Sequence, residues 1–192
     1  SLLGRKGEAR EAAALALACD PGFVPAATLD IELSDRNDEQ KRAAFEAVGS
    51  QHERGGDWKG WWLLAEESAR QKKWSEAARA YGELIRLRAQ GNEPYIGFSI
   101  DAYMAQGLAF LETKDHERAQ EAFIAASALS PGAVEPKLFL AKAYQRARKP
   151  EIAAAIFEGL HAESSPRERS EIALWITAAY NSLSDFDRAL GW

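Results

Sequence analysis

The segment that decides the fold is KWSEAARAY, which runs from Lys73 to Tyr81. Its key feature is a small residue, Ala77, followed four places later by an aromatic one. The same feature recurs twice further along the chain, in KDHERAQEAF at residues 114–123 and in KPEIAAAIF at residues 149–157. Steps of four keep residues on one face of an α-helix. We therefore expect three equivalent helices, each with a small residue where a neighbouring helix approaches and an aromatic residue that fills the space beside it.

A second pattern precedes each of these helices and occurs once more near the end of the chain. Its residues are spaced three, one and three apart, with a small residue in third place. The four sets are Trp61, Leu64, Ala65 and Ser68; Tyr103, Gln106, Gly107 and Phe110; Lys137, Leu140, Ala141 and Tyr144; and Ala173, Ile176, Thr177 and Tyr180. No segment alternates like a strand, and valine is scarce. The chain is therefore predicted to be all-α and built from pairs of helices.

The alanine that opens each second helix recurs at a nearly constant interval. It stands at Ala9, Ala43, Ala77, Ala119, Ala153 and Ala189, with separations of 34, 34, 42, 34 and 36 residues. This pattern resembles the tetratricopeptide repeat, whose unit is about 34 residues long. The resemblance implies a solenoid of helical hairpins with a right-handed superhelix, containing about four full repeats and partial repeats at both ends.

The resemblance predicts a single array over residues 1–192. Its expected units are a partial repeat at 1–23, a degenerate repeat at 24–57, an extended repeat at 58–99, two repeats at 100–133 and 134–169, and a partial repeat at 170–192. Asp30 departs from the pattern because leucine is expected there. The eight extra residues at 92–99 indicate either a lengthened helix, capped by Asn92 with Pro94 in its first turn, or a longer loop.

Composition limits the possible functions. The chain has 192 residues, of which 46% are hydrophobic and 28% charged, and a net charge of -5. An acidic balance argues against nucleic-acid binding. A basic cluster is formed by Arg70, Lys72, Lys73, Arg79, Arg86 and Arg88. RNA-reading pentatricopeptide repeats are the alternative it raises, but the net charge and the repeat signature favour a solvated helix face, balanced by Glu76 and Glu83. The alanine- and arginine-rich composition of the whole chain is typical of high-GC bacteria.

The sequence offers little for chemistry or for a membrane. It has no phosphate-binding loop and no nucleophile elbow, and His52, His116 and His161 have no second metal ligand at a suitable spacing. The single cysteine, Cys19, cannot form an intrachain disulfide. The longest apolar run, Ala12–Cys19, is too short to insert in a bilayer. We expect no enzyme activity, cofactor or metal, and a soluble segment whose compartment, cytoplasm or periplasm, stays open.

The resemblance also implies where a partner binds. In the family, residues of the first helix of each hairpin that avoid the core line a concave groove. The corresponding residues here are Lys59, Trp62, Leu63, Glu66 and Arg70; Asp101, Met104, Leu108 and Glu112; Glu135, Leu138, Lys142 and Arg146; and Glu171, Leu174, Trp175, Ala178 and Asn181. Five of them, Trp62, Met104, Leu108, Leu138 and Trp175, are expected to form an apolar stripe.

Such a stripe predicts a protein or peptide partner with an apolar or amphipathic segment. The alternative is that Trp62 and Trp175 complete the packing of their own hairpins, or that missing helices cover the stripe. The sequence thus predicts a non-catalytic interaction scaffold. A self-association module, acting through the incomplete repeats at the two ends, or a regulatory module of a larger protein is the second hypothesis.

Overall fold

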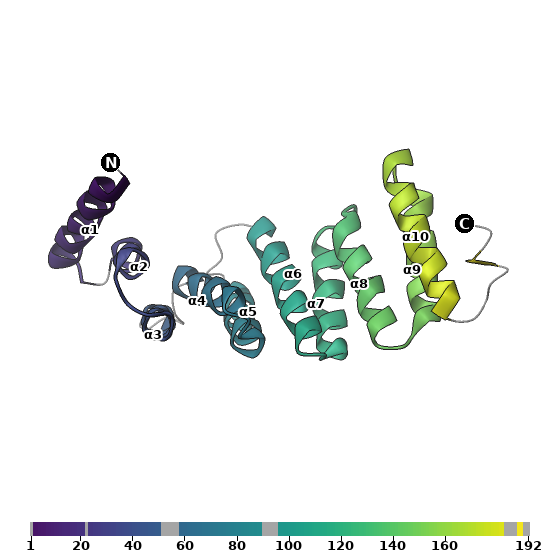
Figure 1. Cartoon of the computed structure of the whole chain (residues 1–192), viewed down its shortest axis with the longest axis horizontal. Coiled ribbons are helices and arrows are strands. Elements are labelled where there is room, and N and C mark those ends of the chain that lie inside the picture. The colour runs from purple at the N-terminus through teal and green to yellow at the C-terminus, as the bar shows by residue number, and fades with distance from the viewer. Residues whose placement is uncertain (1, 22, 51–57, 90–95, 183–187, 190–192) are drawn as a thin grey trace. The chain divides into compact units, whose positions relative to one another are not determined.

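The structure, a computed structural model, describes residues 2–21, 23–50, 58–89, 96–182 and 188–189 (Figure 1). Over these ranges the chain forms ten α-helices and no strand. It divides into two compact units, Ser1–Tyr95 and Ile96–Trp192. The all-α architecture of paired helices is therefore confirmed.

The first unit contains five helices. They are α1 (Leu2–Cys19), α2 (Val24–Leu33), α3 (Asp38–Ser50), α4 (Trp58–Arg70) and α5 (Trp74–Ala89). The α4–α5 pair forms a tight hairpin, and α3 packs on α4. The two hairpin helices are joined by only three residues, which forces them to run antiparallel.

Over residues 96–182, the second unit forms a further five helices, each of which packs against the next along the chain. They are α6 (Ile96–Glu112), α7 (His116–Leu129), α8 (Val134–Arg146), α9 (Pro150–Glu163) and α10 (Pro166–Ser182). At 17 residues, α6 is longer than α4 and α8, which have 13 each. A lengthened helix thus accounts for part of the extra sequence, while its predicted cap at Asn92 and Pro94 lies outside the described residues.

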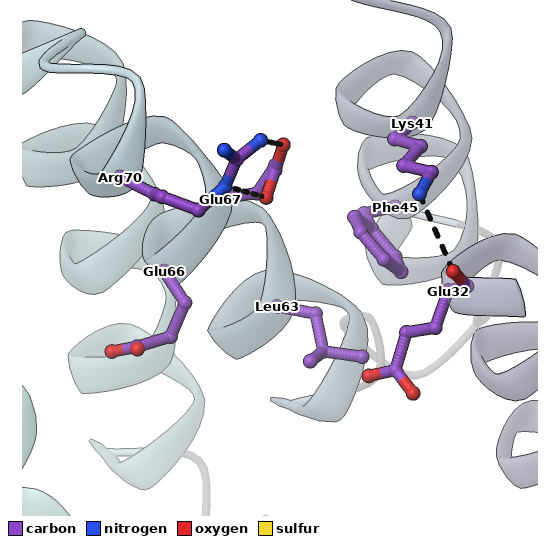
Figure 2. Close-up of a pocket in the computed structure, with 7 residues that line it drawn as sticks. All are labelled: Glu32, Lys41, Phe45, Leu63, Glu66, Glu67 and Arg70. Carbon is purple, nitrogen blue, oxygen red and sulfur yellow. Dashed lines mark hydrogen bonds and ion pairs between the residues drawn. The ribbon is translucent and has the colours of Figure 1, made fainter. Parts of the chain in front are cut away.

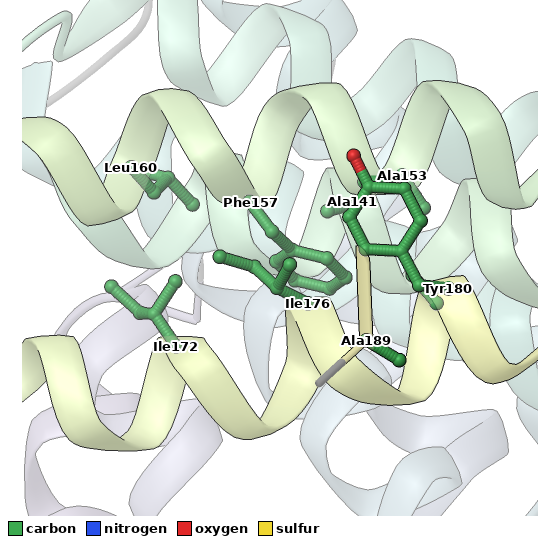
Figure 3. Close-up of a cluster of buried hydrophobic side chains, with 10 residues drawn as sticks. Ala141, Ala153, Phe157, Leu160, Ile172, Ile176, Tyr180 and Ala189 are labelled. Atoms are coloured by element: carbon green, nitrogen blue, oxygen red, sulfur yellow. The ribbon is translucent and has the colours of Figure 1, made fainter. Parts of the chain in front are cut away.

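The repeated alanine and aromatic positions form the core of the hairpins. Ala77, Ala119 and Ala153 are completely buried, and so are the aromatic side chains of Phe123 and Phe157. In the second unit, Figure 3 shows Phe157 between α9 and α10, facing Ile176 of the latter helix. Burying a side chain of this size stabilises the fold by about 2–3 kcal/mol. The sequence pattern therefore marks the residues that hold neighbouring helices together.

Small residues also mark the closest contacts between helices. A Cβ atom added to Gly107 in α6 would lie 2.6 Å from Cε1 of Phe123 in α7. A Cβ added to Gly60 in α4 would lie 2.5 Å from the backbone nitrogen of Gly49 in α3. Any larger residue at either position would push the two helices apart.

Three hairpin turns share one backbone geometry. Lys72, Lys114 and Arg148 have φ angles of 59°, 62° and 59°, which lie in the left-handed region. In the first turn the Lys72 amide donates to the carbonyl of Ala69 at 2.9 Å, and the next amide donates to Ser68 at 2.8 Å. This pair of bonds is the Schellman motif, which satisfies carbonyls at the end of a helix. The other two turns have the same pair of bonds.

The degenerate repeat holds Asp30 where leucine is expected, and it also buries an arginine, Arg42. The Asp30 carboxylate in α2 accepts a hydrogen bond from Arg36 at 3.2 Å and lies 3.8 Å from Arg10 of α1. In α3, Arg42 is 7% exposed and its Nε lies 3.0 Å from Glu76 of α5, while it also donates to Gln71. These charged pairs take the place of part of the apolar packing. Arg42 is buried, and a buried charge needs a partner, which Glu76 provides.

In the sequence, Ser165 and Glu168 have the spacing of a capping box that opens a helix, and Ser184 and Asp187 have that of a second. The Glu168 carboxylate accepts hydrogen bonds from the Ser165 amide at 3.0 Å and from its hydroxyl at 2.6 Å. These bonds lower the pKa of Glu168 below its ordinary value. The carboxylate contacts of the capping box predicted at the start of α10 are thus confirmed. The second predicted box, at Ser184, lies outside the described residues.

Among the described helices, none combines the length and apolar character needed to cross a bilayer.

Candidate partner-binding faces

In the first unit, the predicted groove residues lie along α4. Leu63, Glu66 and Arg70 share one face of the helix with Glu67, because their spacing of three, four and seven brings them into line. Trp62 is half-buried, and its ring meets the ring of Tyr81 in α5 edge to face, with centroids 5.8 Å apart. Trp62 therefore takes part in the packing of its own hairpin, as one of the two sequence hypotheses predicts. Lys59, also half-buried, lies one turn before Leu63.

Part of this face borders a cleft of about 360 Å³, which we call the α4 cleft (Figure 2). Its lining residues come from three helices of the first unit: Glu32 of α2, Lys41 and Phe45 of α3, and Leu63, Glu66, Glu67 and Arg70 of α4. Figure 2 shows Leu63 pointing from α4 toward Phe45 and the Glu32 side chain. The structure thus brings three predicted residues, Leu63, Glu66 and Arg70, to one hollow.

Arg70 is held by acidic neighbours within the chain. Its Nε donates to one oxygen of Glu67 at 2.9 Å, Nη2 donates to the other, and Nη2 also lies 3.2 Å from Asp38 of α3. The hydrogen bond from Arg70 lowers the pKa of Glu67, and the pair in turn raises the pKa of Arg70. Such a fork fixes both side chains in the geometry that suits a guanidinium and a carboxylate.

The other two carboxylates of the α4 cleft belong to Glu32 and Glu66. Glu66 accepts a hydrogen bond from the hydroxyl of Tyr81 at 2.9 Å. Burial, together with the charge of Glu66, raises the pKa of Tyr81 and keeps the phenol neutral. Lys41 donates to the backbone carbonyl of Glu32 at 3.3 Å, not to its side chain. Within the described ranges, no ion pair joins Glu32 or Glu66 to a lysine or arginine.

In the second unit, the predicted residues lie on α6, α8 and α10. On α6, Met104 packs against the Phe123 cluster, Asp101 is exposed and Leu108 is 39% exposed. Leu138 of α8 packs against the Phe157 cluster. On α10, Ala178 is half-buried, Asn181 is exposed and Leu174 is 71% exposed. Leu108 and Leu174 are therefore the large apolar side chains that the first helices of this unit expose most, among the described residues.

Trp175 belongs partly to the core and partly to the surface. Its ring stacks on Phe157 with centroids 6.3 Å apart and an interplanar angle of 22°. In addition, Nζ of Lys142 in α8 lies 4.2 Å from the Trp175 ring centroid and 5.0 Å from that of Phe139. A cation over an aromatic face stabilises by about 0.5–1 kcal/mol at exposed sites. Arg146, one turn further along α8, pairs with Glu112 of α6 at 4.0 Å.

Sequence reasoning missed four residues of the α4 cleft. Glu32, Lys41 and Phe45 lie in the degenerate repeat, which the family pattern covers poorly. Adjacent carboxylates such as Glu66 and Glu67 are typical of a solvated face, yet the Glu67 side chain is only 15% exposed. The spacing of Glu67 and Arg70, three apart on one helix, is the signal that points to their pairing.

The described part of the chain offers no grouping for metal chemistry. No set of three or more His, Cys, Asp or Glu side chains in these ranges is placed to hold a metal ion. Cys19 is exposed on α1, and His116 and His161 are half-buried on α7 and α9. His52 lies outside the described residues.

Comparison with known proteins gives the fold but no close relative. No family model matches the sequence, and no curated protein matches it significantly. Among solved structures, YrrB, a TPR protein with an unusual peptide-binding site, superposes with a TM-score of 0.71 at 12% identity, over 95% of this chain and 89% of YrrB. MamA superposes with a TM-score of 0.64 at 16% identity, over 84% of each chain.

A third similar structure is BtubC from P. vanneervenii. It superposes with a TM-score of 0.67 at 17% identity, over 98% of this chain and 85% of BtubC. At identities this low, the superpositions establish a shared fold and nothing more. That fold agrees with the repeat spacing and with the buried alanine and aromatic positions. The chain therefore has the tetratricopeptide-repeat fold.

Proposed function

We propose that the chain is a non-catalytic scaffold that binds an apolar or amphipathic segment of a partner protein on the exposed faces of its first helices. Tetratricopeptide-like repeats serve as protein-interaction scaffolds in general, because stacked hairpins present extended surfaces. YrrB, which shares the fold, carries a peptide-binding site. The observation that carries the proposal for this chain is the exposure of Leu108 and Leu174 on these faces, at 39% and 71%.

Leu108 and Leu174 are more exposed than the other large apolar side chains described on these helices, and such exposure favours a binding surface. Isolated apolar residues are common on protein surfaces, but contiguous patches usually mark contacts. In the second unit, half-buried Met104, Leu138 and Trp175 extend the apolar area on the same set of helices. A partner that covers these side chains would gain their burial without displacing any core contact.

A capture experiment tests the proposal. We would immobilise the full chain and a Leu108→Ser, Leu174→Ser variant, and identify by mass spectrometry what each retains from lysate of the source organism. The matched control is Ile124→Ser with Ile152→Ser, which removes two comparably exposed apolar side chains, 48% and 44% exposed, from α7 and α9. Circular dichroism confirms that all three proteins are folded.

The expected result is a protein retained by the native chain and by the Ile124, Ile152 variant but lost from the Leu108, Leu174 variant. Loss from the isoleucine variant alone would move the interface to the second helices of the hairpins. Equal retention by all three proteins would contradict binding on the first helices of this unit.

Self-association is the second candidate, and it rests on α1. Leu15 in this helix is 70% exposed, and Phe23, just after it, is 45% exposed. A second copy that covered both side chains would remove a large apolar area from water. Sedimentation of the native chain and of a Leu15→Ser, Phe23→Ser variant over a range of concentrations tests this. A monomer at every concentration for the native chain would rule it out.

A further inference from the structure

We infer that the α4 cleft receives a partner peptide through an apolar side chain that stands next to an arginine or lysine. This inference rests on the proposed scaffold function and specifies the partner for a part of the first unit. Three features of the cleft support it: its apolar floor, its unmatched carboxylates and its occupied cations.

The apolar floor is formed by Leu63 and Phe45. Leu63 is half-buried and points toward Phe45, which is only 3% exposed and is therefore held in place by its own helix packing (Figure 2). A rigid apolar wall is a good anchor point, because little conformational freedom is lost when a ligand binds. The cleft, of about 360 Å³, lies at the small end of the range for ligand pockets, roughly 300–1,000 Å³. It therefore suits one or two side chains rather than a folded element.

The unmatched carboxylates are those of Glu32 and Glu66. Glu32 extends its carboxylate toward Leu63, whereas Lys41 approaches the backbone carbonyl of the same residue (Figure 2). Glu66 accepts its hydrogen bond from the neutral hydroxyl of Tyr81. Two negative charges beside an apolar wall favour a cationic side chain attached next to an apolar one.

The cations of the cleft are already occupied. Arg70 uses both Nε and Nη2 on Glu67 and reaches Asp38 as well. Lys41 donates to Glu32 in the last turn of α2, where carbonyl groups lack partners within the helix. Lys41 keeps its charge, because its partner is a neutral carbonyl, but the three carboxylates of the lining outnumber its two cations. Charge complementarity therefore selects a basic segment and disfavours an acidic one.

Two capped tetrapeptides serve as probes, acetyl-Ala-Leu-Arg-Ala-amide and acetyl-Ala-Leu-Glu-Ala-amide. Each is titrated into the isotope-labelled full chain, and amide chemical shifts are followed by NMR into the millimolar range. The arginine peptide is expected to shift amides around Leu63 and Phe45 in a saturable way, and the glutamate peptide is not. The affinity of the arginine peptide should fall as salt is added, since partly exposed ion pairs are screened.

A charge-only variant isolates the role of the carboxylates. Glu32→Gln with Glu66→Gln keeps the size of both side chains and keeps an acceptor for Tyr81. It is expected to weaken binding of the arginine peptide by about three- to tenfold, the effect of losing two partly solvated ion pairs. The control, Glu121→Gln with Glu151→Gln, makes the same change in net charge at exposed positions of α7 and α9 and should change affinity less than about twofold.

Three results would overturn the inference: no saturable shifts with the arginine peptide, equal binding of the glutamate peptide, or equal weakening in the control variant. The proposed scaffold function is judged separately, by capture that depends on Leu108 and Leu174. Capture that persists while the arginine peptide fails would reject only the α4 cleft as a basic-segment site.

Discussion

At the scale of single residues, Gly107 carries the sharpest steric constraint in the second unit. Alanine at this position would place a Cβ atom 2.6 Å from Cε1 of the fully buried Phe123. We expect Gly107→Ala to lower the free energy of unfolding by about 1–2 kcal/mol, because overpacking outweighs the gain in helix propensity. Urea unfolding followed by circular dichroism measures it.

Gly159→Ala is the matched control for this substitution. Gly159 lies within α9 and is exposed, and the methyl group of an alanine there would meet no other atom within 4 Å. Here only the propensity changes, so we expect a gain of about 0.5–1 kcal/mol. If both substitutions stabilised the protein, α6 and α7 would not approach as closely as the structure places them.

The Glu67–Arg70 pair gives a pH-dependent prediction at the same scale. Arg70 lowers the pKa of Glu67 below its ordinary 4.5, so the charged form is favoured in the folded state. The stability from this pair is present above the unfolded pKa and is lost as the pH falls through the lower, folded pKa. We expect Glu67→Gln to be less stable than the native chain by about 0.5 kcal/mol at pH 7, since solvent screens the pair.

That difference should disappear when both proteins are compared at a pH below the folded pKa of Glu67. Urea midpoints measured at steps between neutral and acidic pH test this. Glu121→Gln, which changes an exposed carboxylate on α7, serves as the control and should match the native chain throughout. A constant gap between the Glu67 variant and the native chain at every pH would mean that Glu67 acts through packing rather than charge.

At the scale of elements, the shared hairpin turn offers the clearest test. Lys72, Lys114 and Arg148 all adopt a left-handed backbone that glycine adopts without steric cost. We expect Lys114→Gly to stabilise the chain by about 0.5–1 kcal/mol. This is the strain energy relieved at the turn minus the entropic cost of the greater freedom of glycine in the unfolded state. Thermal unfolding measures the shift.

Lys114→Ala separates geometry from charge in this test. It removes the same ammonium group but keeps a Cβ atom, so it should bring no stabilisation. Glycine substitutions at Lys72 and Arg148 should add to the effect at Lys114, because the turns are separate and share no side-chain partner among the described contacts. Equal effects of glycine and alanine would show that charge, not the backbone angle, sets the stability of the turn.

At the scale of the whole molecule, the sequence predicts the packing within hairpins well. Ala77, Ala119 and Ala153 are all fully buried, as the repeat pattern requires. These contacts depend on residues four apart on one helix and on a partner helix close in sequence, so they leave a periodic signal. The sequence predicts one array and no boundary between units; the boundary after Tyr95 falls among the extra residues 92–99.

The α4 cleft could not be predicted in the same way. Its shape depends on α2 and α3, where Asp30 stands in place of the expected leucine and the repeat pattern fades. The charge left in the cleft depends on which carboxylates pair with Arg70. In the structure, Arg70 pairs with Glu67 and Asp38. Side-chain geometry decides that choice, and it leaves no periodic trace in the sequence.

The second unit is expected to fold on its own. Among its described residues, the apolar clusters around Phe123 and Phe157 are composed entirely of side chains from this unit. A repeat segment is stable when the interfaces between its own repeats supply enough burial. We therefore expect residues 96–192, expressed separately, to be helical by circular dichroism and to unfold in one cooperative transition in urea.

The native fragment is to be compared with its Phe157→Ala variant. Phe157 is completely buried between α9 and α10, and its removal should cost about 3–5 kcal/mol, a large part of the stability of a domain this size. A cooperative native fragment together with a strongly destabilised variant would show that the Phe157 cluster organises the unit. A gradual, non-cooperative loss of helix in the native fragment would show instead that the second unit needs the rest of the chain, because its own interfaces do not offset the conformational entropy of folding.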